Sequence, residues 1–243
     1  MSTEGFGDMR TLGLVGGMSW ESTASYYGWI NRFVAARFGG LHSARLVLFS
    51  VDFAQVEAMQ AGGRWDEAAG VLADAARRLT AAGADLLVLC TNTMHVLMPQ
   101  LESAVSTPWV HIADATADAV RAEGTRRVGL LGTRYTMDGE FYRGRLTDRH
   151  GLEVLLPGEA DRALVNDVIY DELCRGRVEA ASRAEFRRMV EEMVGRGAEG
   201  VILGCTEIGL LLEESDAPVP LFDTARIHAE RAAAVALGLA GLP

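Results

Sequence analysis

Two cysteines at matching places in two similar segments are the residues best suited to chemistry. Cys90 ends the segment GADLLVLC (residues 83–90), and Cys205 ends the similar segment GAEGVILGC (residues 197–205). A free thiol has a pKa of about 8.5, and nearby donors or a helix N-terminus lower it. One thiolate could therefore remove a proton from one face of a carbon while the partner thiol returns one to the other face. This exchange would invert a stereocentre.

The competing interpretation is that a free cysteine is a small buried hydrophobic side chain. Cys174 lies within the helical run YDELCR (residues 170–175), and we interpret it as structural. Cys90 and Cys205 instead recur beside polar residues, Thr-Asn in the first copy and Thr-Glu in the second. This recurrence favours a chemical role for these two thiols.

The elements that must position the thiols alternate between short strands and helices, which is typical of parallel α/β sheets. Eight strands are predicted, at residues 11–15, 44–49, 85–89, 109–112, 127–131, 153–155, 200–203 and 219–222. Helices are predicted at residues 21–38, 65–82, 113–123, 138–149, 161–175, 182–196 and 224–239. Eight such strands would permit a (β/α)₈ barrel.

An internal repeat favours two domains over a barrel. The opening LGLVGG (residues 12–17) matches VGLLGT (residues 128–133), and each lies at nearly the same distance before its cysteine. We therefore predict an α/β fold of two similar four-stranded parallel-sheet domains related by a pseudo-twofold duplication. The predicted domains are residues 1–112 plus 225–243, with the last helix packing back onto the first copy, and residues 113–224. Ligands bind beyond the carboxyl ends of such strands, so both thiols should lie where a substrate binds.

Composition excludes several function classes. The 243 residues carry a formal net charge of −10, and every basic residue is arginine. Pyridoxal-phosphate enzymes, Schiff-base aldolases and P-loop nucleotidases each need a lysine amine, so the absence of lysine excludes these mechanisms. The acidic chain has no basic tract, which argues against nucleic acid as a partner.

Targeting and metal signals are weak. The first ten residues contain no apolar run, and the longest apolar stretch, residues 232–243, is too short to span a bilayer. We expect no membrane association and, with three widely separated cysteines, a reduced cytoplasmic protein. Four histidines are scattered singly and are expected to be structural or exposed, so no metal site is predicted: His42, His111, His150 and His228.

The motifs CTNTMH (residues 90–95) and GCTE (residues 204–207) resemble the paired active-site motifs of the aspartate/glutamate racemase family. The resemblance extends to GLVGGMSWE (residues 13–21), SVDF (residues 50–53) and IYDEL (residues 169–173), and so covers nearly the whole chain. It implies a cofactor-independent, two-cysteine racemase of a small-molecule amino acid, built from two similar α/β domains and assembled as a homodimer.

The resemblance also implies roles for individual residues. Cys90 and Cys205 would be the two bases, and backbone N–H groups near Met18 and after Cys90 could hold the substrate carboxylate. His95 could orient the first thiol, or bond to backbone instead. The expected substrate contacts are Met18, Gln55, Thr91, Asn92, Thr93, Thr133, Thr206 and Glu207.

One departure from the family concerns the substrate side chain. Members strict for aspartate hold its distal carboxylate with an arginine after the second strand and a lysine in the second domain; this chain has neither. Either Arg175, Arg177 or Arg183 supplies a positive charge, or the substrate is not strictly acidic. We predict a broader amino-acid racemase. The alternatives are an enzyme of the maleate isomerase or hydantoin racemase type, and a non-catalytic protein that binds small anions.

Overall fold

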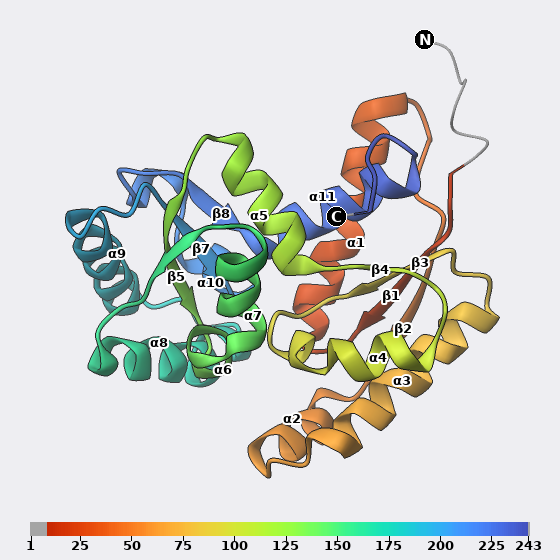
Figure 1. The fold of residues 1–243 in the computed structure, drawn as a ribbon, viewed down its shortest axis with the longest axis horizontal. Helices are drawn as coiled ribbons and strands as arrows, with labels where there is room; N and C mark the ends of the chain where they lie inside the picture. The colour runs from red at the N-terminus through yellow and green to blue at the C-terminus, as the bar shows by residue number, and fades with distance from the viewer. Residues whose placement is uncertain (1–8, 243) are drawn as a thin grey trace. The chain divides into compact units, whose positions relative to one another are not determined.

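The chain divides into two compact α/β units. The computed structural model describes residues 9–242. One unit extends to His111 and also includes the C-terminal segment from His228; the second unit is Ile112–Ile227 (Figure 1). Each unit contains one four-stranded parallel sheet with helices between its strands, which confirms the predicted fold class.

The first unit has the strand order β2-β1-β3-β4. Helix α3 packs against β1 and β2 and contacts α4. Figure 1 shows α1 and α11 away from the face that α3 covers. The strands are β1 (Leu12–Gly16), β2 (Leu46–Ser50), β3 (Leu86–Leu89) and β4 (Trp109–Val110). The helices are α1 (Trp20–Phe38), α2 (Phe53–Ala61), α3 (Trp65–Ala81), the 3₁₀ turn η1 (Thr93–Leu97), α4 (Met98–Ala104) and the greater part of α11 (Thr224–Ala236).

The second unit repeats this order as β6-β5-β7-β8, so its strands correspond one by one to those of the first. The strands are β5 (Arg127–Gly132), β6 (Glu153–Leu155), β7 (Gly200–Gly204) and β8 (Leu221–Asp223). The helices are α5 (Ile112–Ala122), α6 (Arg134–Asp138), α7 (Glu140–Gly144), the π-helical turn η2 (Arg145–Arg149), α8 (Glu159–Asp171), the 3₁₀ turn η3 (Leu173–Arg175), α9 (Ala180–Gly195), α10 (Ile208–Leu211) and the 3₁₀ turn η4 (Glu214–Asp216).

The central strands and the helix starts explain why the repeat folds twice. All residues of β1, β3 and β7 are buried, as expected for strands covered on both faces. The residue that caps the helix after the first strand is a hydroxyl residue in both units. Ser19 accepts a hydrogen bond from the N–H of Ser22, and Thr133 accepts one from the N–H of Thr136.

Several helices differ from their predicted bounds. The predicted helix at residues 138–149 is instead α7 followed by η2, and the one at 161–175 ends at Asp171 before η3. Short helices at the strand ends were not predicted: α2, α4, α6 and α10. Such segments bury too few residues to leave a clear periodicity, although Asp52 does cap α2 by accepting from the N–H of Ala54.

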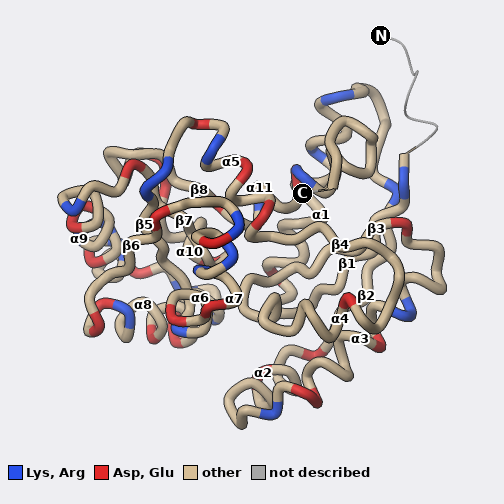
Figure 2. The backbone as a smooth tube through the Cα atoms, in the orientation of Figure 1, with Lys and Arg blue, Asp and Glu red and all other residues tan. Residues whose placement is uncertain are grey.

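Charged residues of both signs are interspersed along α8 and α9 (Figure 2). Arg188 contacts three carboxylates there, those of Asp161, Glu185 and Glu192. Among the described residues, no helix has both the length and the apolar character needed to cross a bilayer. Over the same residues, no cluster of three or more His, Cys, Asp and Glu side chains is arranged to hold a metal ion.

Candidate active site

The strand order creates the same kind of crevice position in each unit. The chain passes from β1 to β2 on one side and then crosses back to β3, so β1 and β3 are neighbours at a topological switch point. The equivalent pair in the second unit is β5 and β7. Ligands of open α/β sheets bind at the carboxyl ends of such strands. Cys90 directly follows β3, and Cys205 directly follows β7.

The turn after β1 brings Met18 to the edge that carries Cys90. Gly17 has a φ of 96°, and a Cβ atom there would lie 2.2 Å from the carbonyl oxygen of Val51, so only glycine fits. The N–H of Cys90 donates to the carbonyl of Val15 at 2.9 Å, which joins the two strand ends. The glycine turn therefore leads the chain from β1 into the capped start of α1 beside the first thiol.

Cys90 lies in an apolar environment. Its side chain is fully buried, and its Sγ makes a long contact of 4.0 Å with the carbonyl oxygen of Val88. Burial raises the pKa of the Cys90 thiol far above its ordinary value. The thiol is therefore protonated near neutral pH in the substrate-free protein.

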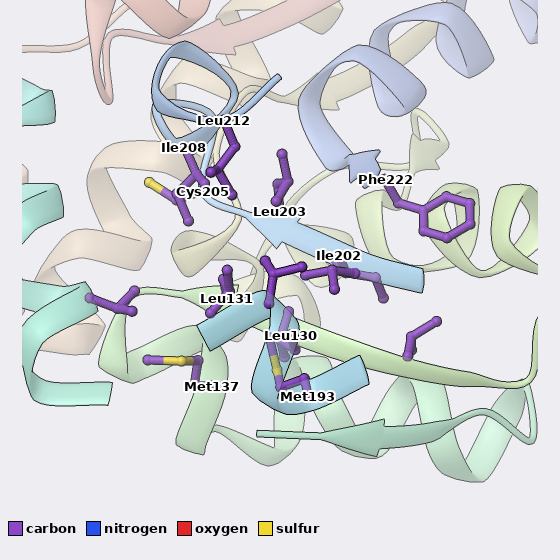
Figure 3. Close-up of a cluster of buried hydrophobic side chains, with 14 of the residues drawn as sticks. Leu130, Leu131, Met137, Met193, Ile202, Leu203, Cys205, Ile208, Leu212 and Phe222 are labelled. Carbon is purple, nitrogen blue, oxygen red and sulfur yellow. The ribbon is translucent and has the colours of Figure 1, made fainter. Parts of the chain in front are cut away.

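Cys205 is buried beside a carboxylate. Its Sγ–H donates to Oε2 of Glu207 at 3.0 Å, and the hydroxyl of Thr206 donates to the same oxygen at 2.5 Å. Figure 3 shows Cys205 at the edge of the hydrophobic cluster of this unit, with its sulfur turned away from Leu203. The two thiols thus differ, because only Cys205 has a carboxylate at hydrogen-bond distance among the contacts described.

The carboxylate of Glu207 also affects ionisation. Burial raises the pKa of the Cys205 thiol well above its ordinary value, and the negative charge of Glu207 and the nearby Cys174 raise it further. A cation placed beside this pair would act in the opposite direction. In the substrate-free protein the thiol of Cys205 is protonated near neutral pH.

The sequence-predicted residues lie mostly at the carboxyl edges of the two sheets, one group in each unit. Met18, Thr91, Asn92 and Thr93 are buried at the edge that carries Cys90. Thr133, Thr206 and Glu207 lie at the edge that carries Cys205, where Thr133 caps α6. Gln55 is exposed on α2, and its neighbour in the same helix, Gln60, is buried instead.

A family model for Asp/Glu/Hydantoin racemase matches residues 15–232 of the chain. This match covers both cysteine motifs and both units. The chain belongs to the Asp/Glu/hydantoin racemase family.

Individual racemase relatives agree with this assignment. A proposed Asp/Glu racemase from Yersinia pestis is 52% identical, with a TM-score of 0.89 over 94% of this chain and 100% of that one. An aspartate racemase homologue from Pyrococcus horikoshii OT3 is 33% identical, with a TM-score of 0.82 over 94% of this chain and 99% of that one. The broad specificity amino-acid racemase RacX of Bacillus subtilis (strain 168) is 26% identical over 159 residues, which are 65% of this chain and 68% of RacX. The protein is thus an isomerase of the amino-acid racemase type.

The three arginines that were candidates for binding an acidic side chain are engaged in contacts of their own. Arg175 pairs with Asp171 at 3.1 Å, and Arg177 donates to the backbone carbonyl of the same residue at 2.6 Å. Arg183 pairs with Glu213 at 2.9 Å and with Asp216 at 3.0 Å. Arg175 and Arg183 are therefore paired with carboxylates within the second unit, and Arg177 is held by a backbone carbonyl there.

Sequence reasoning missed a cluster of histidines in this racemase. His111 and His228 lie singly in the sequence, but in the structure both are buried and their rings flank that of His95. His150 also has a specific partner, since its Nε2 lies 2.7 Å from the carboxylate of Asp114. His228 lies more than a hundred residues after the other two histidines, which hid the cluster from periodicity arguments.

Proposed function

We propose that this racemase inverts the α-carbon of an amino acid by two-thiol proton transfer, without a cofactor. The observation that carries the proposal is the recurrence of a buried cysteine directly after the third strand of each unit's sheet, at a switch point. Two-base inversion needs one acid and one base that act on opposite faces of one carbon. A duplicated unit with one thiol in each copy suits this requirement.

Glu207 supplies the asymmetry that starts the reaction. In the substrate-free protein both thiols are protonated, because burial raises both pKa values. A substrate ammonium close to the sulfur of Cys205 would stabilise the thiolate, and the Cys205 proton would pass to the Glu207 carboxylate that already accepts its hydrogen bond. The Cys205 thiolate then takes the α-proton from one face, and Cys90 gives its proton to the opposite face. The reverse reaction uses the same two groups in exchanged roles.

The polar residues beside the thiols would hold the substrate. Backbone N–H groups at the start of α1, near Met18, favour the α-carboxylate because a helix N-terminus attracts anions. Thr91, Asn92, Thr93 and Thr206 add hydroxyl and amide groups at the same edges. Gln55, exposed on α2, and Thr133, which caps α6, complete the proposed set of substrate contacts.

We propose a broad substrate range in place of strict specificity for aspartate or glutamate. A buried acidic side chain needs a cationic partner, and Arg175, Arg177 and Arg183 are already engaged. The relative from Bacillus subtilis carries the name of a broad specificity racemase. Neutral side chains fit this electrostatic environment better than acidic ones.

We also propose that the protein forms a homodimer in the reducing cytoplasm. Its three cysteines are all free thiols, which suits a reducing compartment. The dimer is an expectation from the family, and the complementation experiment described in the Discussion tests what each protomer contributes.

The experiment that tests this function follows the α-proton. Purified protein, freed of metals and cofactors, is incubated in D₂O with single L-amino acids that include aspartate, glutamate, alanine and methionine. We expect deuterium at the α-carbon together with the D-enantiomer. A panel without exchange or inversion would overturn the assignment, and conversion of maleate to fumarate by the same protein would favour a maleate isomerase reaction instead.

A further inference from the structure

The segment after Cys90 is tied to a buried array of aromatic side chains. Nδ1 of His95 lies 2.7 Å from the carbonyl oxygen of Thr91, the residue that follows the thiol. A carbonyl oxygen can only accept, so Nδ1 of His95 carries the proton and donates. This bond closes the turn between the end of β3 and η1 from the inside, while the N–H of Thr91 donates to the carbonyl of Leu89 at 2.8 Å.

The His95 ring is itself held by two other histidines. Its centroid lies 4.7 Å from that of His111 and 5.8 Å from that of His228, with interplanar angles of 63° and 67°. These are edge-to-face arrangements of the kind that aromatic rings prefer. All three side chains are at most 5% exposed, so their orientations are determined by packing. Helix α11, the residue after β4 and the 3₁₀ turn η1 thus meet at the His95 ring.

Helix α11 fixes the far end of the array. His228 donates from Nε2 to the carbonyl oxygen of Val110 at 2.7 Å. The hydroxyl of Tyr26, on α1, then donates to Nδ1 of His228 at 2.9 Å. Burial lowers the pKa of His228 from 6.5 to about 4, so this ring is neutral at physiological pH. Each polar atom of the His228 ring has one defined partner, and the ring has little freedom to move.

We propose that His95 is a positioning residue for Cys90, acting through the Thr91 carbonyl and backed by the array of Tyr26, His111 and His228. The inference rests on the proposed two-thiol function. The geometry directs the Nδ1 proton of His95 to the backbone of the turn. Proton transfer requires the donor and acceptor atoms within a few tenths of an ångström of a productive geometry. A turn that is held from the interior keeps Sγ of Cys90 at a constant position relative to the substrate.

A matched pair of variants separates positioning from general stability. His95→Leu removes the Nδ1 donor, whereas His95→Asn keeps an N–H near the same position. Exchange of the α-proton in D₂O is measured separately for L- and D-methionine and for L- and D-aspartate. Cys90→Ser identifies the enantiomer that Cys90 deprotonates, and His42→Leu controls for loss of a histidine outside the array.

We expect His95→Leu to slow exchange from the Cys90-dependent enantiomer by about 10- to 100-fold. Exchange from the other enantiomer should change by less than about twofold, and His95→Asn should recover most of the loss. KM should stay near the wild-type value, since the substrate contacts remain. Equal losses for both enantiomers, or no loss, would overturn the inference.

Two further measurements keep the inference testable. If Cys90→Ser leaves exchange from both enantiomers unchanged, the two-thiol function is wrong. The positioning of Cys90 is then tested by the rate at which methyl methanethiolsulfonate modifies Cys90 relative to Cys205. A faster relative rate in His95→Leu, restored by His95→Asn, supports positioning; an unchanged rate overturns it. If His95→Leu does not fold, Tyr26→Phe replaces it. We then expect a smaller loss in the exchange rate of the Cys90-dependent enantiomer. Equal losses for both enantiomers would contradict the inference.

Discussion

The thiols define the chemistry at the scale of single residues. We expect Cys90→Ser and Cys205→Ser each to lower the rate of racemisation by at least about 1,000-fold, because a hydroxyl is a far weaker base than a thiolate. Cys174→Ser should keep the rate within about threefold of wild type. The measurement is the rate of optical inversion for each purified variant. Wild-type rates in either of the first two variants would contradict the mechanism.

Cys174 is the sharper control because it is near the site. Its charge contributes to raising the pKa of Cys205, and it packs against the same hydrophobic cluster. The variant therefore tests whether proximity to the second thiol is enough for a role. A large loss in Cys174→Ser would mean that interpreting this residue as structural is wrong.

Single residues also determine whether the enzyme prefers acidic or neutral substrates. Arg175→Ala, Arg177→Ala and Arg183→Ala should alter turnover of aspartate and methionine by the same factor, since all three guanidinium groups are engaged on the surface of their own unit. The measurement is the ratio of kcat/KM for the two substrates. An arginine that binds a desolvated distal carboxylate would instead cost aspartate about 2 to 5 kcal/mol more than methionine when removed. Such a selective loss would identify that arginine as the side-chain contact.

At the scale of elements, the close packing of β1 against α1 depends on a residue without a side chain. A Cβ atom at Gly16 would lie 2.3 Å from Cγ2 of Thr23, whose hydroxyl already bonds to the N–H of Gly17 and the carbonyl of Ser19. We expect Gly16→Ala to lower the free energy of unfolding by about 1 to 3 kcal/mol. Chemical denaturation at neutral pH measures this change.

Gly70 provides the matched control. It lies within α3, is exposed, and has open space where a Cβ atom would be. Gly70→Ala should therefore raise the free energy of unfolding by about 0.5 to 1 kcal/mol, since alanine is the better helix former. If both variants shifted stability in the same direction, close packing at Gly16 would not explain the effect.

Helix α11 makes stability depend on pH. Burial lowers the pKa of His228 to about 4 in the folded protein, below its ordinary value of 6.5. The unfolded chain therefore binds a proton more readily, and the stabilisation is complete above pH 6.5 and is lost as the pH falls towards 4. A pKa difference of this size corresponds to about 3 kcal/mol.

His228→Gln tests this pH dependence. Glutamine keeps an N–H for the carbonyl of Val110 but does not titrate. We expect the free energy of unfolding of the variant to decline less steeply than that of wild type between pH 6.5 and 4, starting from a value lower by about 1 kcal/mol because the Tyr26 bond is lost. Denaturant titrations at several pH values provide the comparison. Parallel curves would show that another group causes the acid sensitivity.

At the scale of the whole molecule, the duplication predicts that one chain supplies both thiols of a site. Mixing Cys90→Ser with Cys205→Ser protein under conditions that exchange subunits should then restore no racemisation, because neither chain carries both cysteines. Sedimentation establishes first that wild type is a homodimer and that the mixture contains heterodimers. Recovery of activity in the mixture would show that the two thiols of one site come from different protomers.

Much of the architecture follows from local information. Short runs of β-branched residues and leucine predicted all eight described strands to within a few residues, because a buried strand is a short, continuous apolar segment. The repeated cysteine segments, followed by Thr91 and Thr206, predicted the two edges at which the candidate site residues gather. The strand segments and the cysteine segments are patterns of neighbouring residues, so they can be recognised from the sequence alone.

Tertiary structure alone decided which distant groups meet. His95, His111 and His228 come from three separate segments and share no sequence pattern, yet packing brings their rings together beside the Cys90 turn. The engagement of Arg183 by Glu213 and Asp216 was equally hidden, although it decides whether that charge can reach a substrate. The sequence by itself determined the periodic elements and the reactive side chains, because these depend on neighbouring residues. Their long-range partners depend on how the strands and helices pack, and no local pattern records that packing.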